Sequence, residues 1–186
     1  MAIDASKIKV AGSGAIWKAP TGTTLPSDAA ASYAAGFVNL GWISDGGFEI
    51  DQSLKTKNVM GWQSVEVLRV VNTSIERSVK FSALESNAQT VALAWGGATI
   101  TAGTSGAYTV DLPAAQVINE FVLGIDWFDG STTQRILIKR AVLKSLPKVK
   151  FSRQDAINYD FEIMALAPAD GSDAIIVYGV DTGVAS

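Results

Sequence analysis

The alternation of apolar and polar residues is the feature of this sequence that most constrains its fold. Residues 157–163 carry apolar side chains at odd positions and polar side chains at even positions. Successive side chains of a β-strand point to opposite faces, so this spacing predicts a half-buried strand. Other segments alternate in the same way or are rich in β-branched residues: 65–71, 75–83, 117–127, 136–143 and 174–178. The chain is therefore predicted to be mostly β, with antiparallel strands.

Clusters of turn residues separate the predicted strands. Asp129-Gly130 lies between two apolar runs and is a strong hairpin signal, because an Asp-Gly pair adopts the backbone angles of a tight turn. Three more clusters have similar composition: 45–47, 103–106 and 170–172. Residues 20–35 are rich in Thr, Ser, Ala and Pro and are expected to form an irregular, exposed loop.

Residues 86–95 depart from the alternation and are predicted to form a helix. Apolar residues recur there at positions i, i+3, i+4 and i+7: Ala88, Val91, Ala92 and Trp95. Asn87 or Ser86 can cap the start, and the two glycines after Trp95 can end the helix. The expected architecture is an antiparallel β-sandwich or barrel with one flanking helix, which packs on a sheet through Trp95. No shift in composition marks a boundary, so residues 1–186 are expected to form a single domain.

The composition removes most catalytic and metal-binding chemistry. The 186 residues include no cysteine and no histidine, which excludes thiolate nucleophiles, Ser-His-Asp triads and zinc sites built on either residue. The formal net charge of −3 is not the basic footprint of a nucleic-acid binder. No apolar stretch reaches the roughly 18 residues of a membrane helix. No enzymatic activity, cofactor, metal or membrane association is expected.

Carboxylates at same-face spacing are what remains for catalysis or cation binding. The pairs are Glu49 with Asp51, Asp160 with Glu162 and, more loosely, Asp126 with Asp129. Such pairs can act as acid and base on a sugar or hold a hard cation. The first two pairs lie opposite an apolar face, which is typical of a solvated sheet face, and that interpretation is preferred.

Residues 135–153 are rich in Lys and Arg and contain no carboxylate. A basic stripe can bind phosphate backbones. Phe151 is the sole aromatic residue of this stretch, whereas proteins that bind single strands interleave several rings with their basic residues. Pairing with carboxylates of this chain or of a protein partner is therefore favoured over nucleic-acid binding.

Residues 45–62 are predicted to project from the sheet as an extended loop or β-hairpin. The segment starts as a strand, becomes polar over residues 51–58 and ends with Met60-Gly61-Trp62. Such an arm contains too few apolar residues to be stable alone, which indicates support from another subunit. A mobile surface loop is the alternative.

The tryptophans divide into two groups by their sequence neighbours. Trp17, Trp42 and Trp62 lie beside glycines or polar residues and are interface candidates, because an indole combines a large apolar surface with a polar N–H. Trp95 and Trp127 fit apolar faces and are assigned to the core.

Four segments resemble the major tail tube proteins of long-tailed, siphovirus-type bacteriophages, most closely those of actinobacteriophages. They are residues 14–26, 40–47, 67–74 and 81–87, which read GAIWKAPTGTTLP, LGWISDGG, VLRVVNTS and FSALESN. The resemblance implies a structural, non-enzymatic protein with a β-sandwich and a flanking helix. It also implies rings, usually hexameric, that stack into a tube through which DNA passes during ejection without specific binding.

The same resemblance implies a location and partners. The protein would belong to the virion tail and would assemble in the host cytoplasm with itself, the tape measure protein, the tail terminator and the distal tail proteins. Some relatives carry a further immunoglobulin-like domain at the C-terminus, which a chain ending at Ser186 is expected to lack.

The resemblance further assigns residues 45–62 as the arm that reaches the neighbouring ring. The expected contacts between subunits or rings are Lys55, Lys57, Asn58, Met60 and Trp62, with Trp17 and Trp42 as further candidates. Residues 7–17 and the tail after Tyr178 are also inter-ring candidates. Residues 1–13 and 180–186 are expected to be flexible or to become ordered only on assembly.

The wall of a channel that conducts DNA should not retain it. Basic walls bind DNA through counterion release, so an acidic or neutral lumen suits passage. The expected lumen-facing residues are Glu49, Asp51, Asp160 and Glu162. Two other functions fit a β-sandwich of this kind: a carbohydrate- or ligand-binding module, and a secretion-system tube of similar fold.

Overall fold

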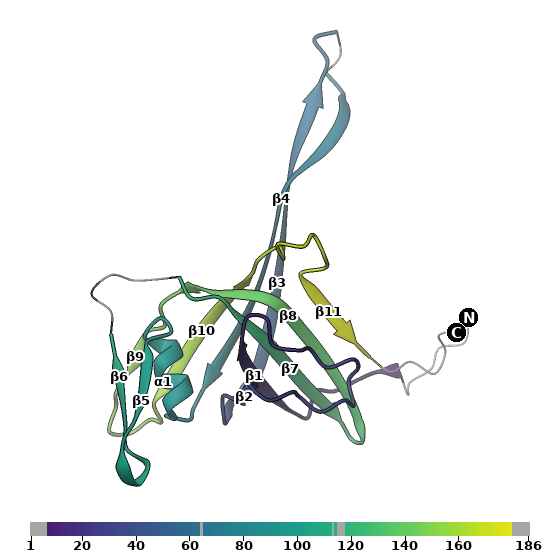
Figure 1. Cartoon of the computed structure of the whole chain (residues 1–186). Helices are drawn as coiled ribbons and strands as arrows, with labels where there is room; N and C mark the ends of the chain where they lie inside the picture. The colour runs from purple at the N-terminus through teal and green to yellow at the C-terminus, as the bar shows by residue number, and fades with distance from the viewer. Residues whose placement is uncertain (1–6, 64, 113, 115–117, 180–186) are drawn as a thin grey trace.

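A computed structural model describes residues 7–63, 65–112, 114 and 118–179. Nine strands of this part of the chain form one curved antiparallel sheet (Figure 1). They are β1 (Ser13–Pro20), β2 (Val38–Asn39), β3 (Ile43–Met60), β4 (Val67–Ala83), β7 (Phe121–Asp129), β8 (Thr132–Ser145), β9 (Val149–Lys150), β10 (Asn158–Ala165) and β11 (Ile175–Tyr178). The order is β2-β1-β7-β8-β10-β4-β3, with β11 paired to β8 and β9 to β10. The predicted mostly β, antiparallel fold is confirmed.

Some expectations fall on residues outside this description. One is the prediction that residues 1–6 and 180–186 are flexible or become ordered only on assembly. The other is the prediction that Val117 lies on the apolar face of a strand.

Strand β8 pairs with two different strands along one of its edges. Its residues 135–138 pair with β11, and its residues 141–145 pair with β10. The other edge pairs with β7, where Asp129 lies opposite Thr132 across the turn. Gly130 in this turn has φ of 59°, which glycine adopts without steric cost. The predicted Asp-Gly hairpin is confirmed.

The sheet curls around its core but does not close into a barrel, with β2 and β3 at its two ends. The start of β3 nevertheless comes close to β1. The Leu40 N–H donates to the Ile16 carbonyl at 2.9 Å, just before β3 begins, and the Leu84 N–H donates to the Trp42 carbonyl at 2.8 Å. The barrel alternative is therefore not realised.

One face of the sheet holds the hydrophobic core. Tyr159, Phe161 and Ile163 are buried on β10, as the alternation predicts. The other buried members of the cluster come from β1, β4, β7, β8, the helix that follows β4 and the segment just before β3: Ile16, Leu40, Val79, Phe81, Ala83, Leu93, Ala94, Phe121, Leu123, Ile125, Ile136, Ile138 and Ala141. Phe81 and Phe161 lie on paired strands with ring centroids 5.3 Å apart. The period of two therefore identifies the core face correctly on β10, over residues 79–83 of β4 and over residues 121–125 of β7. Ile75 is 55% exposed and Trp127 is half-buried outside the core cluster, so the assignment of Trp127 to the core is wrong.

A short helix, α1 (Ala88–Ala94), flanks the core as predicted. The Thr90 N–H donates to the Asn87 side chain at 2.9 Å, which caps the helix. The expected packing of Trp95 is wrong. Trp95 is the C-terminal cap and is 47% exposed, whereas Thr90, Ala92, Leu93 and Ala94 are buried. The helix has only seven residues. Thr90 Oγ1 donates to the Leu40 carbonyl at 2.9 Å, which turns the face around Thr90 toward the core, and this buried face ends before Trp95.

A second small sheet lies next to the helix. It consists of β5 (Thr99–Ala102) and β6 (Tyr108–Asp111), joined by the 3-10 turn η2 (Thr104–Gly106). The sequence predicts this connection from the glycines at both ends of the turn, and it is confirmed. Tyr108 Oη donates to the Ser86 carbonyl at 3.4 Å, which ties the small sheet to the start of the helical segment.

The opposite face of β7 and β8 is covered by the connection between β1 and β2. The sequence predicts this connection to be exposed, which is wrong for its central part: Pro26 is buried and Tyr33 is half-buried. The central part of the connection is covered because Arg135 holds it against the sheet, and the Arg135 side chain is itself only 5% exposed. Its Nη1 donates to the carbonyls of Asp28 and Ala31 at 2.8 and 2.7 Å, so it fastens the connection to the sheet.

Arg135 is neutralised by Asp126 on the adjacent strand. Nε and Nη2 donate to the two carboxylate oxygens of Asp126 at 2.7 and 3.2 Å. Tyr33 Oη donates to the same carboxylate at 3.0 Å, and the guanidinium lies 4.2 Å from the centre of the Tyr33 ring. Burial, followed by the negative charge of Asp126, raises the pKa of Tyr33. The Asp126–Arg135 pair is a buried ion pair with all its charges satisfied.

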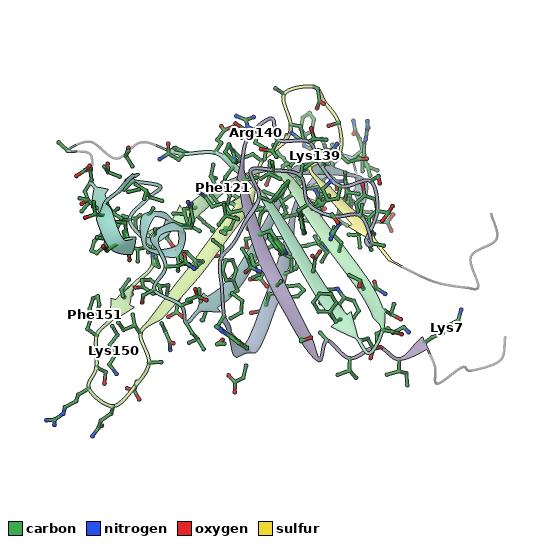
Figure 2. All side chains as sticks on the ribbon, turned by 60° about the horizontal axis from the view of Figure 1, so that its bottom comes forward. Lys7, Phe121, Lys139, Arg140, Lys150 and Phe151 are labelled. Carbon is green, nitrogen blue, oxygen red and sulfur yellow. The ribbon has the colours of Figure 1, made fainter. Side chains whose placement is uncertain are left out.

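The basic stretch does not form one surface. Lys139 and Arg140 lie together near Phe121, whereas Lys150, at the end of β9, and Phe151 lie far from them (Figure 2). Most of its members pair within the chain, as favoured from the sequence: Arg135 with Asp126, Arg140 with Glu120, Lys144 with Glu76 and Glu162, and Lys150 with Asp155. A phosphate-binding stripe is therefore not present. No helix in the described ranges is long and apolar enough to cross a membrane.

Candidate assembly surfaces

The most prominent surface is a long hairpin, here called the arm and defined as residues 53–76. Strands β3 and β4 leave the body of the sheet together and run on as a two-stranded ribbon (Figure 1). The predicted projecting hairpin is confirmed, but its second strand comes from β4 rather than from residues 45–62. Residues 45–47 are not a turn between strands. They lie in an irregularity of the β3–β4 register. Ile43 pairs with Ala83, and the next paired residue of β3, Phe48, pairs with Phe81.

The register divides the arm into two chemically different faces. Residues paired across an antiparallel ladder share a face. One face is uncharged and is made by the pairs Leu54–Ile75, Thr56–Asn72, Asn58–Val70 and Met60–Val67. The other face is cationic beyond Glu76 and is made by the pairs Lys55–Ser74, Lys57–Val71 and Val59–Arg69. Single additional residues in β4, Thr73 and Leu68, shift the register but keep this division.

Apolar side chains of the arm contact water to an extent that is unusual for a folded protein. Trp62 is 99% exposed and Val65 is 96% exposed at the tip. Along the ribbon, Leu54, Met60 and Leu68 are more than half exposed. A two-stranded ribbon is marginally stable by itself, and a contiguous exposed apolar patch indicates an interaction surface.

The predicted interface residues divide between the arm and the body. The structure brings Lys55, Lys57, Asn58, Met60 and Trp62 together on the arm. Trp42 lies just before β3, at the other end of that strand, and is 77% exposed. Trp17 is half-buried and stacks on Tyr33 at 4.8 Å. The role of these residues in an interface stays a prediction.

Sequence reasoning missed the second strand of the arm as part of the same surface. Val67, Val70 and Ile75 supply most of the apolar groups on its uncharged face. The available signal was that six of the eleven residues 65–75 are β-branched, which predicts a strand soon after the polar segment 51–58. Arg69, which interrupts this run, marks the cationic face.

The predicted lumen-facing carboxylates share the outer face of β3, β4 and β10. Glu49 and Glu162 both lie opposite Lys80, and Asp160 lies opposite Ser82. Lys80 pairs with Asp51, and Lys144 Nζ lies 2.8 Å from Glu76 and 3.0 Å from Glu162. The hydrogen bond to Glu76, with that to Glu162, raises the pKa of Lys144, and the bond from Lys144 lowers that of Glu76. This face is a network of charges with more carboxylates than amines.

The third carboxylate pair does not form a site. Asp126 is buried with Arg135, whereas Asp129 is partly exposed and lies 3.9 Å from Lys9. The described residues contain no group of three or more carboxylates able to hold a metal ion.

A cleft of about 820 Å³ lies between the start of β1 and the start of β3. Residues 11–16 form one wall, and residues 41–48, with Asn39, Glu85, Asp126 and Trp127, form the rest. β2 pairs with β1 only at Trp17 and Lys18, so the edge of β1 that faces the cleft has no strand partner in the described sheet. Asp45 and Glu85 supply carboxylates to this lining, which contains no Lys or Arg.

Comparison with known proteins gives one result. A family model described as phage tail tube protein matches residues 1–185. No match to the chain is found among curated proteins.

Proposed function

Since the chain belongs to the phage tail tube protein family, a family of structural proteins of the virion tail, we propose that its copies close into hexameric rings. The rings stack into a channel that conducts DNA during ejection. The arm carries this proposal, because it exposes apolar residues on a ribbon that only another molecule can support. No catalytic activity is part of the proposal.

The ends of the open sheet supply a means of ring closure. β3 lies at one end of the strand order and β2 at the other. Unpaired edges are templates for pairing with another chain. Repeated pairing of unlike edges around an axis closes a ring when the rotation is right. In this proposal the sheet edges join subunits within a ring, and the arm joins one ring to the next.

We propose that the tube assembles in the host cytoplasm with the tape measure, tail terminator and distal tail proteins as partners. The experiment for self-assembly is negative-stain electron microscopy of the full chain over a concentration series, with light scattering. Rings or tubes of uniform diameter with a stained channel are expected. A strict monomer at every concentration, with tryptophan fluorescence that responds to glycans, would favour the carbohydrate-binding alternative instead.

The charged outer face is proposed to line the channel. Glu49, Asp51, Asp160 and Glu162 share that face, and its excess of carboxylates disfavours retention of the DNA backbone. We expect virions with Asp160→Lys and Glu162→Lys to eject DNA more slowly, by about tenfold, because each added cation binds phosphate. Ejection is measured by the release of DNA from purified virions after triggering.

A matched control carries the same change in charge elsewhere. Asp170→Lys and Asp173→Lys alter two exposed residues in the connection between β10 and β11, and their ejection rate should equal that of the unmodified virion. If both double variants form tails of normal appearance and eject DNA at equal rates, the assignment of Asp160 and Glu162 to the lumen is wrong.

A further inference from the structure

We propose that the tip of the arm of one copy docks in the cleft between β1 and β3 of the next copy along the tube. The inference depends on the proposed function, because it needs stacked copies, and it names the receptor for the arm. The arm tip is defined as residues 60–63 and 65–67, and the cleft is the one lined by residues 11–16 and 41–48.

The arm tip and the cleft lie at opposite ends of the same strand. β3 begins at Ile43 in the wall of the cleft and ends at Met60 at the tip. Its 18 residues at about 3.3 Å each give a separation of up to roughly 60 Å. A second copy displaced along this direction therefore presents its cleft to the arm of the first. Contacts between unlike surfaces of this kind repeat without closing and generate a filament.

The apolar surfaces of the two sites match. The tip exposes Trp62 and Val65 almost completely. The cleft includes the exposed Trp42 ring and the half-buried Phe48 and Trp127 side chains. Its volume of about 820 Å³ lies in the roughly 300–1,000 Å³ range of pockets that enclose a ligand. The indole of Trp62 can be buried there together with its neighbours on the tip.

The cationic face of the arm below the tip is opposite in charge to the cleft, whereas the tip itself carries one charged residue, the acidic Glu66. The arm carries Lys55, Lys57 and Arg69, and within the described residues Lys57 and Arg69 have no carboxylate partner. The cleft has carboxylates and no Lys or Arg. Asp126 is occupied by Arg135, which leaves Asp45 and Glu85 without a cationic partner in the described part of the chain. Opposed unpaired charges steer association and fix its register.

The backbone around the cleft also favours a β partner. The β1 edge at Ser13–Ala15 is not paired by β2, and the irregularity at residues 44–47 interrupts the β3 ladder. Main-chain N–H and carbonyl groups that lack partners can pair with an incoming strand. Gly46 and Gly47 add no side chains to this lining.

Cysteine cross-linking tests the inference directly, since the chain contains no cysteine. A Gln63→Cys chain, which keeps Trp62 at the tip, is assembled with a Ser44→Cys chain that carries a tag of different mass. Ser44 lines the cleft. Mild oxidation of the tubes should yield the mixed disulfide dimer at about ten times the level of a matched control, because docking raises the effective concentration of the two thiols.

The matched control replaces Ser44→Cys by Ala169→Cys. Ala169 is exposed in the connection between β10 and β11, far from the cleft in the sequence and in the sheet. Tubes with equal or negligible cross-linking at both positions would overturn the assignment of the cleft and leave the proposed function intact. Absence of any ring or tube from the unmodified chain would overturn both.

A second variant tests the cleft without a thiol. A Cβ at Gly46 would meet only Ser44 Oγ, at 3.7 Å, and Gly46 lines the cleft, so Gly46→Trp adds a bulky ring there without a clash at Cβ. We expect tubes at least about ten times shorter, with an unchanged thermal midpoint of the monomer. Ala169→Trp is the matched control, because Ala169 is exposed in the connection between β10 and β11 and lies outside the cleft; this variant should leave tube length unchanged. Tubes of normal length with a filled cleft would contradict the proposal.

Discussion

Replacement of residues 54–75 by Asn-Gly is expected to abolish tube elongation while the body of the protein still folds. Ser53 lies opposite Glu76, and an Asn-Gly pair joins two such positions in a tight hairpin turn. None of the removed residues belongs to the buried core, so the free energy of unfolding should change by less than about 1 kcal/mol. Tube length by electron microscopy and the thermal midpoint by circular dichroism are the two measurements.

The small hairpin provides a matched control for this deletion. Residues 103–107 link β5 and β6 and are exposed. Their replacement by Asn-Gly shortens a second projecting element but leaves the arm intact, and the tubes should keep their length. Normal tubes from the armless chain would show that stacking depends on another surface.

Asp126→Ala is expected to reduce the free energy of unfolding by about 3–5 kcal/mol, the usual cost of removing one partner of a buried ion pair. Arg135 would keep its charge in a site where its side chain is 5% exposed. The connection over residues 20–37 would then lose its anchor, because the Arg135 donors that hold Asp28 and Ala31 are positioned by Asp126. Chemical denaturation with a two-state fit measures the change.

Two controls separate burial from charge in this prediction. Glu120→Ala removes one partner of the ion pair with Arg140, in which both side chains are about one-third exposed, and should cost no more than about 1 kcal/mol. The double variant Asp126→Leu with Arg135→Met removes both charges and should recover part of the loss. Similar costs for Asp126→Ala and Glu120→Ala would show that the buried pair does not anchor the connection.

Local periodicity predicted several strands of the body and their buried faces, but not the faces of the arm, where Val65, Val67 and Val71 are exposed. The alternation at residues 157–163 gives the correct core face of β10, because one face of that strand is buried and the other is not. The helix was equally accessible, since Asn87 and the two following glycines mark both of its ends. Family membership is confirmed by a match over residues 1–185, in agreement with the resemblance of four segments in the first half.

Interactions between distant segments could not be predicted in this way. The role of Arg135 depends on Asp126 and on carbonyls more than a hundred residues earlier in the chain, and no local pattern encodes that distance. Trp95 was misassigned because a helix of two turns has little room for a full stripe. Residues 45–47 read as a turn because an irregularity within a strand uses the same Asp and Gly residues as a hairpin turn.

The continuity of β3 and β4 from the body into the arm has a mechanical consequence. Tension applied at the tip would run along the backbones of β3 and β4 together, so it would load the hydrogen bonds of the β4–β10 ladder side by side where the ribbon enters the body. At the foot of the ribbon, Lys144 links Glu76 to Glu162 on β10 and passes part of the load into the next strand. A tube joined by such ribbons should resist stretching while yielding to curvature, since each ribbon is two strands wide and can twist. The additional residues Thr73 and Leu68 mark where that bending would concentrate.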